Sequence, residues 1–343
     1  FGSRHLASTG TSPQEQELPP SPPLPTAMPV TPAPSAKADA VFVPGLMKGK
    51  VLFVTGGGSG IGLGICLAFA RLGAKVAICG RTEAKLVEAA EAIRRAGAED
   101  VLYAKADVRN PEDCHAAVDM VGSKWGKVDV FVNNAAGNFM SLAEDVSPNA
   151  FKTVVDIDLR GTFHMSKAAL PWLREAAKDG AGATMLSISA TLYYTAMPFQ
   201  GHAAAAKAGI DSLTKTFAAE WADYGIRVVS IAPGPIADTE GGPTGRVFGQ
   251  TGGAARDVRM TVPLGRYGTT DDIANAAIFL ASPAGSFISG TNLVVDGMQW
   301  QAVSVSGMLM NKDRIRAAMM KQRDTHERGE GSRGHASDRQ AKL

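Results

Sequence analysis

The segment with the clearest chemistry is a glycine-rich stretch between a short apolar run, Val51-Leu52-Phe53-Val54, and a helix-like stretch through Leu72. It reads Thr55-Gly56-Gly57-Gly58-Ser59-Gly60-Ile61-Gly62. Glycines permit positive φ angles and close backbone approach, and a helix N-terminus offers free N–H groups and a favourable dipole to an anion. The segment therefore predicts a phosphate cradle for a nucleotide, with a purely structural glycine turn as the alternative.

The second apolar run ends at Arg81. Enzymes that use NAD usually offer a carboxylate to the ribose 2′-hydroxyl at this place, whereas a guanidinium suits a 2′-phosphate. Arg81 therefore predicts NADPH as the cofactor, and a solvated surface arginine is the alternative. Further candidate cofactor contacts follow the third, fourth and sixth runs, at Asp107, Val108, Asn134, Ala135, Pro233, Gly234, Pro235, Ile236 and Thr239.

These motifs need a scaffold in which strands and helices alternate. Apolar runs predict strands at 51–54, 75–79, 101–106, 128–132, 183–188, 227–231 and 292–295. Segments with a 3.6-residue period predict helices up to residue 72 and at 83–96, 111–125, 149–175, 202–223 and 270–280. Such alternation is typical of βαβ units with a parallel sheet covered on both faces. We expect a single α/β domain, a Rossmann-type doubly wound sheet of about seven parallel strands.

Composition narrows the class of protein. The 343 residues are 45% hydrophobic and 20% charged, which is enough for one sizeable core. A net charge of +2 argues against a strongly basic nucleic-acid binder. The three cysteines are far apart and form no Cys-x-x-Cys motif, so neither a disulfide scaffold nor a metal site is expected. No apolar run approaches the roughly 18 residues of a membrane span.

The two ends of the chain differ from the middle. Residues 1–45 hold 10 of the 19 prolines and show little apolar periodicity, which predicts a disordered leader. The nucleotide-binding domain is expected at 46–305. A polar tail follows at 306–343, with a short helix predicted at 311–320 and the final tripeptide Ala341-Lys342-Leu343.

The motifs together resemble the short-chain dehydrogenase/reductase family over about residues 48–300. They are TGGGSGIG at 55–62, NNAAG at 133–137, AAAAKAG around Lys207, PGP at 233–235 and VVDG at 294–297. Most members use Tyr-x-x-x-Lys, in which a tyrosine moves a proton to or from a carbinol oxygen. Here Ala203 stands four residues before Lys207. The resemblance therefore disfavours an alcohol dehydrogenase and leaves two readings: an enzyme whose chemistry needs no tyrosine there, or a non-catalytic nucleotide-binding member.

Within that family, four strings resemble the 2,4-dienoyl-CoA reductases, above all their peroxisomal branch. They are NNAAGNF (133–139), FKTVVDIDLRGTF (151–163), FQGHAAAAKAG (199–209) and APGPIADTEG (232–241). The resemblance implies transfer of a hydride from NADPH to the δ-carbon of a 2,4-dienoyl-CoA and of a proton to the α-carbon, which yields a trans-3-enoyl-CoA in β-oxidation of unsaturated fatty acids. It also implies a homotetramer built through the helices at 149–175 and 202–223. A trans-2-enoyl-CoA reductase is the nearest alternative.

The same resemblance assigns the acid machinery. Asp158 stands where ordinary members carry an asparagine that organises a proton-relay water, and we expect Asp158, Lys207 and one water to protonate carbon. Asp156 is the competing candidate, and a helix-capping or ion-paired aspartate is the structural alternative. The mitochondrial branch carries a tyrosine fifteen residues before the lysine. Here that position is Leu192, although Tyr193 and Tyr194 follow directly.

Substrate contacts and the cellular address follow from the resemblance as well. Asn138 and Phe139 are expected at the acyl thioester. The phosphates of coenzyme A need cations, and the candidate contacts are Arg81, Arg109, Arg246, Ser147 and Asn149. Ala341-Lys342-Leu343 is a variant of the Ser-Lys-Leu peroxisomal signal, which predicts a peroxisomal location and the import receptor as a partner.

Overall fold

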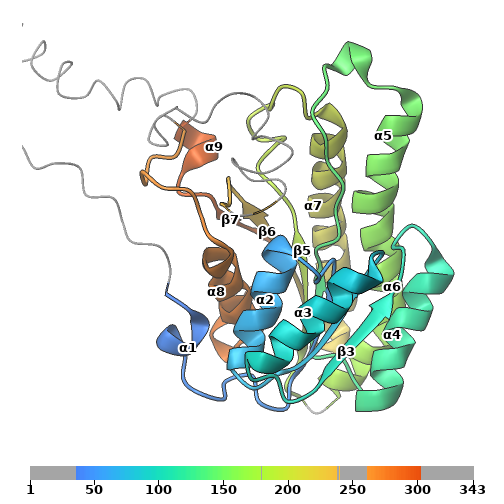
Figure 1. Ribbon diagram of the computed structural model, residues 1–343, viewed down its shortest axis with the longest axis vertical. Helices are drawn as coiled ribbons and strands as arrows, with labels where there is room; N and C mark the ends of the chain where they lie inside the picture. Colours follow the sequence, from blue (N-terminus) through green and yellow to red (C-terminus); the bar gives the residue numbers. More distant parts are fainter. Residues whose placement is uncertain (1–35, 179, 238, 240–260, 303–343) are drawn as a thin grey trace, which may run out of the picture. The chain divides into compact units, whose positions relative to one another are not determined.

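The computed structural model describes residues 36–178, 180–237, 239 and 261–302. A seven-stranded parallel sheet lies at the centre of this part of the chain, with the strand order β3-β2-β1-β4-β5-β6-β7 (Figure 1). The strands are β1 (Val51–Thr55), β2 (Lys75–Gly80), β3 (Val101–Lys105), β4 (Val130–Asn133), β5 (Ala183–Ile188), β6 (Ile226–Pro233) and β7 (Asn292–Val295). The Rossmann-type doubly wound fold expected from the sequence is confirmed.

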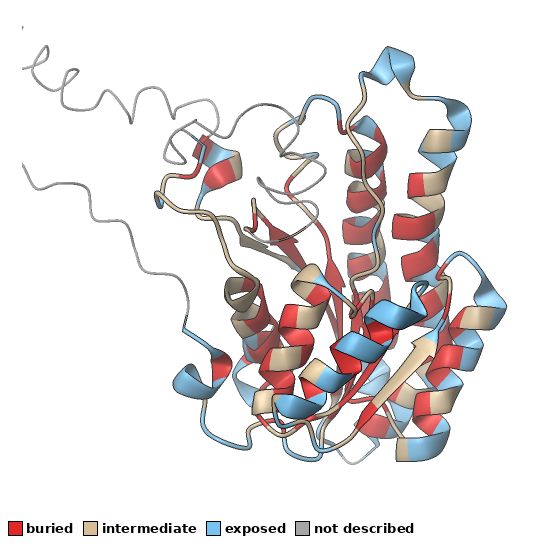
Figure 2. Ribbon diagram, viewed as in Figure 1, coloured by how far each residue is buried: buried red, intermediate tan, exposed pale blue. Residues whose placement is uncertain are grey.

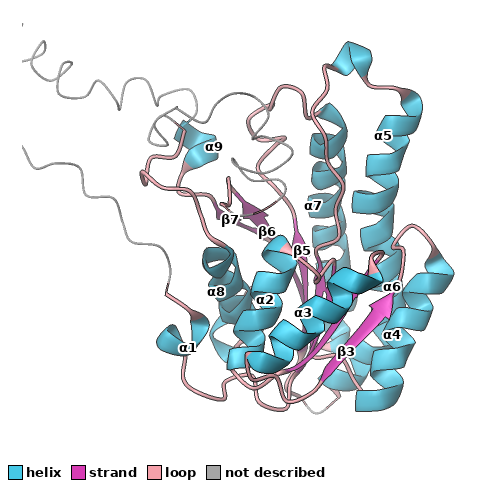
Figure 3. Cartoon of the chain, in the orientation of Figure 1, coloured by secondary structure: helices cyan, strands magenta, loops and turns pink. Residues whose placement is uncertain are grey.

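Helices cover both faces of the sheet (Figure 3). The main ones are α2 (Gly60–Arg71), α3 (Glu83–Arg95), α4 (Pro111–Trp125), α5 (Pro148–Val155), α6 (Gly161–Ala177), α7 (Gly201–Trp221) and α8 (Thr270–Ala281). Shorter ones are α1 (Ala38–Val41), α9 (Gln299–Ala302) and the 3₁₀ turns η1 (Ala143–Asp145), η3 (Ala222–Tyr224) and η6 (Pro283–Gly285). Within the described part of the chain, every helix is too short or too polar for a transmembrane span.

Two hydrophobic clusters form because alternate residues of a strand point to opposite faces. Leu52 and Val54 of β1 pack with α2, α3 and α8, while Phe53 packs on the other side with α4, α6 and α7. Each central strand is therefore buried on both faces, which explains why it reads as a continuous apolar run. Figure 2 shows the same division, with helix surfaces buried toward the sheet and exposed away from it.

The helix predicted at 149–175 is interrupted in the structure. A π-helical turn, η2 (Asp156–Arg160), separates α5 from α6, and the Gly161 N–H donates to the Asp156 carbonyl. One extra residue shifts the phase of the apolar pattern by a single position, and the helical period on either side is unchanged, so the sequence predicts both segments as one helix. Single π turns occur often at functional sites, and this one contains Asp158.

The disordered leader was predicted to extend to residue 45, and this boundary is wrong for residues 36–45. Ala38 of α1 is fully buried in the core, and the Asn275 side chain of α8 donates to the Ala36 carbonyl at 2.9 Å. The reason is that α2 and α8 leave an apolar surface that a short segment can cover, a feature invisible in the composition of the segment itself. The tail helix predicted at 311–320 lies outside the described residues.

Candidate active site

The site lies at the carboxyl ends of the parallel strands, where loops from several βα units converge. The glycine loop follows β1, the 134–139 segment follows β4, the 189–200 segment follows β5, and the Pro-Gly-Pro loop follows β6. All seven strands point the same way, so residues distant in sequence meet at this single edge.

The glycine loop has the geometry of a phosphate cradle. Gly56 and Gly60 adopt φ angles of 66° and 54°, which side chains rarely accept. A β-carbon added to Gly62 would lie 2.4 Å from the Asn134 side-chain nitrogen, so only glycine fits there. Ser59, the N-cap residue of α2, makes no side-chain capping bond, and the first N–H groups of α2 remain available to an anion. These residues fit a dinucleotide cofactor.

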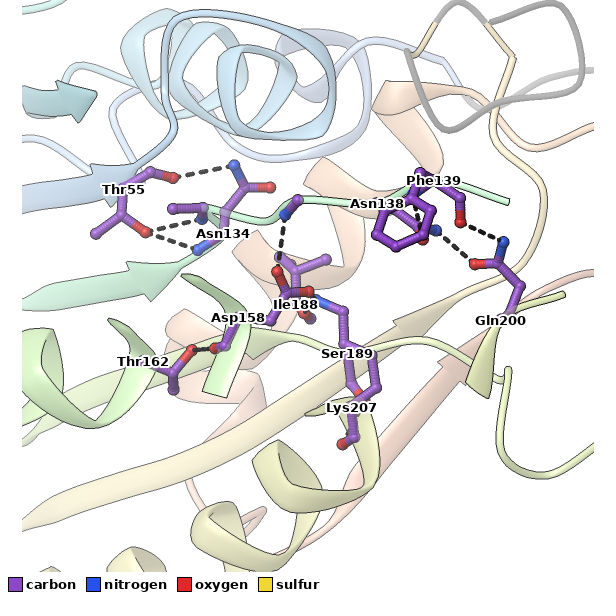
Figure 4. A network of polar contacts seen from close by, with 12 residues as sticks. Thr55, Asn134, Asn138, Phe139, Asp158, Thr162, Ile188, Ser189, Gln200 and Lys207 are labelled. Carbon is purple, nitrogen blue, oxygen red and sulfur yellow. Dashed lines mark hydrogen bonds and ion pairs between the residues drawn. The ribbon is translucent and has the colours of Figure 1, made fainter. Parts of the chain in front are cut away.

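Thr55 and Asn134 fasten this loop to the next strand. The Thr55 hydroxyl accepts hydrogen bonds from the N–H groups of Asn134 and Ala135, both at 2.9 Å (Figure 4). The Asn134 amide donates to the carbonyls of Thr55 and Gly56 at 3.0 and 3.2 Å. Both side chains, which the sequence assigns to the cofactor, thus also hold the backbone that would contact it.

The Pro-Gly-Pro loop lies against the glycine loop. A β-carbon added to Gly60 would lie 3.7 Å from the Thr239 methyl group, and the Thr239 hydroxyl donates to the Ile236 carbonyl at 3.1 Å. Ile236 forms a parallel bridge with Gly268. Gly234 packs so closely that an added β-carbon would lie 2.6 Å from Asp296. Of the predicted cofactor residues in this loop, Thr239 therefore lies beside the predicted cradle, while Gly234 and Ile236 pack against Asp296 and Gly268.

Asp107 and Arg109, predicted to contact different ligands, are bonded to each other. The Arg109 guanidinium donates to both carboxylate oxygens of Asp107 at 2.5–3.0 Å. The hydrogen bond from Arg109 is the largest cause that lowers the pKa of Asp107, while partial burial opposes it. Val108 between them is buried and packs against Gly161, and Arg81 lies exposed just after β2.

The centre of the site is a buried pair formed by Asp158 and Lys207. Asp158 is 1% exposed and Lys207 8%. The Lys207 Nζ lies 3.2 Å from Asp158 Oδ2 and donates to the Ile188 carbonyl at 3.0 Å, and the Gly137 N–H donates to Asp158 Oδ1 at 2.7 Å (Figure 4). Asp158 on the π turn and Lys207 on α7 thus lie next to each other, as expected from the sequence.

The competing carboxylate, Asp156, faces other partners. It forms ion pairs with Lys152 and with Arg160, the latter at 2.7 Å. The hydrogen bond from Lys152 is the largest cause that lowers its pKa. Asp158 is therefore the member of the Asp-Ile-Asp string that contacts Lys207. The Thr162 hydroxyl supports it by donating to the Asp158 carbonyl at 2.6 Å.

Neither candidate tyrosine offers its hydroxyl to Lys207. Tyr193 and Tyr194 donate to the carboxylate of Asp211, at 2.7 and 3.3 Å. Asp211 is buried and also accepts from Ser230 and Asn292, at 3.0 and 2.6 Å. Burial is the main cause that raises the pKa of Tyr193. The carboxylate that holds both hydroxyls lies on α7, one turn beyond Lys207.

The predicted substrate contacts are dispersed. Asn138 and Phe139 follow Gly137 and contact the start of α7. The Ser147 hydroxyl caps α5 by accepting from the Ala150 N–H at 3.1 Å, and the Asn149 carbonyl accepts from Thr153. Arg246 and the C-terminal tripeptide lie outside the described residues.

No role is predicted from the sequence for several polar residues that build the site. All four are buried and hydrogen-bonded: Gln200, His202, Thr162 and Asp211. A polar residue inside an otherwise apolar or alanine-rich string is the signal that could have pointed to them, because a polar side chain in such a string needs a hydrogen-bond partner if the string is buried.

The all-parallel sheet, the glycine cradle and the lysine on α7 together define a nucleotide-dependent oxidoreductase. The chain belongs to the short-chain dehydrogenase/reductase family: a family model described as "Enoyl-(Acyl carrier protein) reductase" matches residues 56–297. Members of this family use NAD(H) or NADP(H).

Three known proteins illustrate the similarity. The peroxisomal 2,4-dienoyl-CoA reductase of Arabidopsis thaliana is 43% identical over 267 residues, covering 76% of this chain and 88% of the relative. The peroxisomal 2,4-dienoyl-CoA reductase of Rattus norvegicus is 41% identical over 263 residues, covering 77% and 88%. The crystal structure of a 3-ketoacyl-(acyl-carrier-protein) reductase from Brucella melitensis, complexed with NADH, superimposes with a TM-score of 0.66 at 35% identity, covering 74% of this chain and 99% of that one.

Proposed function

We propose that this protein reduces 2,4-dienoyl-CoA thioesters to trans-3-enoyl-CoA with NADPH, in β-oxidation of unsaturated fatty acids. The observation that carries the proposal is the buried Asp158–Lys207 pair beside Ala203, where most members of the family place a tyrosine. A phenol suits proton transfer to a carbinol oxygen, whereas a carboxylate and an ammonium can hold a water that protonates carbon. The names of the relatives from Arabidopsis and rat support the same substrate class.

The residues of the pair have capacity left for this task. An ammonium has three N–H donors; Lys207 donates one to the Ile188 carbonyl and lies 3.2 Å from Asp158 Oδ2 as an ion pair. Asp158 Oδ1 accepts one hydrogen bond from Gly137, Oδ2 is ion-paired with Lys207, and each oxygen retains a lone pair for a water. Lys207 thus has one donor for a ribose hydroxyl of the cofactor or for the water.

When bound, NADPH would supply a hydride for the δ-carbon of the dienoyl thioester. Negative charge then moves through the conjugated system to the thioester oxygen, where hydrogen-bond donors stabilise it. The water held by Asp158 donates a proton to the α-carbon, and the Lys207 ammonium offsets the charge of the hydroxide until solvent restores its proton. One hydride and one proton are thus added, and the remaining double bond lies between the β- and γ-carbons.

Arg81 and Arg109 are proposed to bind the phosphate groups of the cofactor and of coenzyme A. Arg81 is exposed after β2 and is proposed to bind the 2′-phosphate of NADPH and to reach the coenzyme A moiety. Arg109 has an exposed side chain and is proposed to contact a coenzyme A phosphate from its position on Asp107. Asn138 and Phe139 are proposed to meet the thioester, with Ser147, Asn149 and Arg246 as further contacts of coenzyme A.

The proposal includes a peroxisomal location and a homotetramer. The import receptor is proposed to bind Ala341-Lys342-Leu343, and the peroxisomal names of the relatives support this location. The tetramer would form through the helical stretch at 149–175 and α7. Fluorescence microscopy with and without the last three residues tests the first point, and sedimentation analysis tests the second.

One assay separates the proposal from its alternatives. NADPH consumption is measured with 2,4-hexadienoyl-CoA, with 2-hexenoyl-CoA and with a ketone control. We expect turnover with the dienoyl thioester only. Turnover with 2-hexenoyl-CoA only would identify a trans-2-enoyl-CoA reductase, and no turnover with any substrate would identify a non-catalytic nucleotide-binding member.

A further inference from the structure

Two buried polar residues at the start of α7 have no part in the proposed chemistry. Gln200 is the N-cap residue of α7 and is fully buried, and His202 in its first turn is 1% exposed. Gln200 Nε2 donates to the Phe139 carbonyl at 3.0 Å, and His202 Nε2 lies 3.0 Å from the same oxygen. Burying two polar side chains is costly unless they are bonded, and both are bonded to one backbone carbonyl.

The contacts around Phe139 form a closed set, which we call the α7 clamp: Asn138, Phe139, Gln200 and His202. The Phe139 N–H donates to the Asn138 side-chain oxygen at 2.8 Å, and the Asn138 amide donates to Gln200 Oε1 at 2.6 Å. The Phe139 ring stacks on the His202 imidazole with centroids 4.0 Å apart and planes 10° apart. Backbone and ring of Phe139 are therefore both fixed.

The clamp is linked to the buried pair from two sides. Gly137, two residues before Phe139, donates its N–H to Asp158 at 2.7 Å. Lys207 lies on α7 about one and a half turns after His202. A displacement of the 137–139 segment would therefore remove a hydrogen bond from Asp158 while Lys207 stayed in place.

The chain enters the clamp through strained backbone. Ala196 and Phe199 are non-glycine residues with φ angles of 49° and 65°, and the Ser141 N–H donates to the Phe199 carbonyl at 3.2 Å. Left-handed conformations of such residues persist only where surrounding contacts impose them, and they cluster at functional sites. The contacts of the clamp are therefore among those that must hold this backbone in place.

We propose that Gln200 and His202 are positioning residues that hold the 137–139 segment, and through Gly137 the Asp158 carboxylate, in the geometry that binds and protonates the acyl thioester. This inference rests on the proposed function. His202 acts with Nε2 protonated, because a carbonyl can only accept a hydrogen bond. Its Nδ1 is buried without a partner among the described residues, so the clamp holds the neutral ring.

Two substitutions at position 202 separate the ring stack from the hydrogen bond. His202→Phe keeps the ring and removes the donor, and His202→Gln keeps an amide N–H that can reach the same carbonyl. With 2,4-hexadienoyl-CoA we expect His202→Phe to lower kcat about tenfold and raise KM severalfold, since a buried bond of this kind is lost. The KM for NADPH stays unchanged, and His202→Gln recovers most of kcat. His115→Phe, at an exposed histidine of α4, is the matched control and has no effect.

Gln200→Met tests the second donor in the same way, and ring ¹⁵N NMR of the wild type reports the tautomer without any turnover. We expect an Nε2-protonated, neutral His202. If the wild type does not reduce the dienoyl thioester, the proposed function fails, while the tautomer and the affinity of the NADP⁺-loaded variants for 2,4-hexadienoyl-CoA still test the clamp. An Nδ1-protonated ring overturns the inference. The inference is also overturned if both His202→Phe and Gln200→Met have the kcat, the KM and the acyl-CoA affinity of the wild type. It is overturned as well if these variants lose affinity for NADPH and for acyl-CoA to the same extent.

Discussion

Substitution of Asp158 by asparagine and by alanine separates its role in folding from its role in chemistry. Both changes remove the negative charge that lies 3.2 Å from the Lys207 ammonium. Only asparagine keeps an oxygen that can accept the Gly137 N–H, which lies 2.7 Å from Asp158 Oδ1. Asparagine also nearly preserves the side-chain volume, so the two variants differ in one hydrogen bond and a small cavity.

The expected loss of stability follows from these contacts. Removal of one partner of a buried ion pair typically costs about 3–5 kcal/mol, because the other charge is left uncompensated. Lys207 keeps its bond to the Ile188 carbonyl, so Asp158→Asn is expected at the lower limit, about 3 kcal/mol. Asp158→Ala also leaves the Gly137 N–H without an acceptor, which adds about 1–2 kcal/mol. Urea unfolding at neutral pH measures both values.

The expected loss of activity is the same for both variants. Neither can hold the water as a carboxylate does, so kcat with 2,4-hexadienoyl-CoA falls by about 10²–10⁴-fold. Asp156→Asn is the control, because Asp156 lies in the same π turn but pairs with Lys152 and Arg160, and it keeps normal turnover. Turnover of Asp158→Asn within tenfold of the wild type would refute the assigned role, and equal stability of the two Asp158 variants would refute the importance of the Gly137 bond.

Four further predictions concern the residues around the pair. Arg81→Asp weakens NADPH binding by about 10–100-fold through loss of charge-assisted hydrogen bonds, and unchanged constants for NADPH and NADH would contradict the 2′-phosphate role. Arg109→Ala weakens acyl-CoA binding and reduces the sensitivity of this binding to salt, which titrations at two ionic strengths check. If the variant and the wild type have the same affinity at each ionic strength, Arg109 does not contact the substrate. Tyr193→Phe retains kcat within about twofold, since its hydroxyl is held by Asp211, and a hundredfold loss would return this tyrosine to the chemistry. Burial lowers the pKa of His202, so the unfolded chain binds a proton that the folded chain does not, and the free energy of unfolding decreases as pH falls below about 6.5. Urea unfolding at pH 7.5 and 5.5 detects this decrease in the free energy of unfolding, which is absent in His202→Gln. An equal decrease in the wild type and in His202→Gln would contradict the assignment to His202.

The sequence alone was sufficient for the fold and for the position of the glycine loop. The alternation of apolar runs with helical periods predicted the seven-stranded parallel sheet, because burial on both faces leaves a continuous apolar signature in each central strand. The glycine loop was equally predictable, since Gly56 and Gly60 adopt positive φ angles that other residues avoid. These features depend on local backbone geometry, and local geometry is encoded within a few neighbouring residues.

Tertiary structure decided between side chains that the sequence had left as alternatives, and it supplied the contacts that no motif indicated. The π turn directs Asp158, and not Asp156, toward Lys207, and the helical period on either side of that turn is unchanged. Asp211 holds both tyrosines, and the α7 clamp fixes Phe139, through contacts between residues far apart in the chain. Such contacts depend on how helices pack across the edge of the sheet. A pattern of residue types along one sequence specifies which elements form, but the distances between their side chains exist only after those elements have packed.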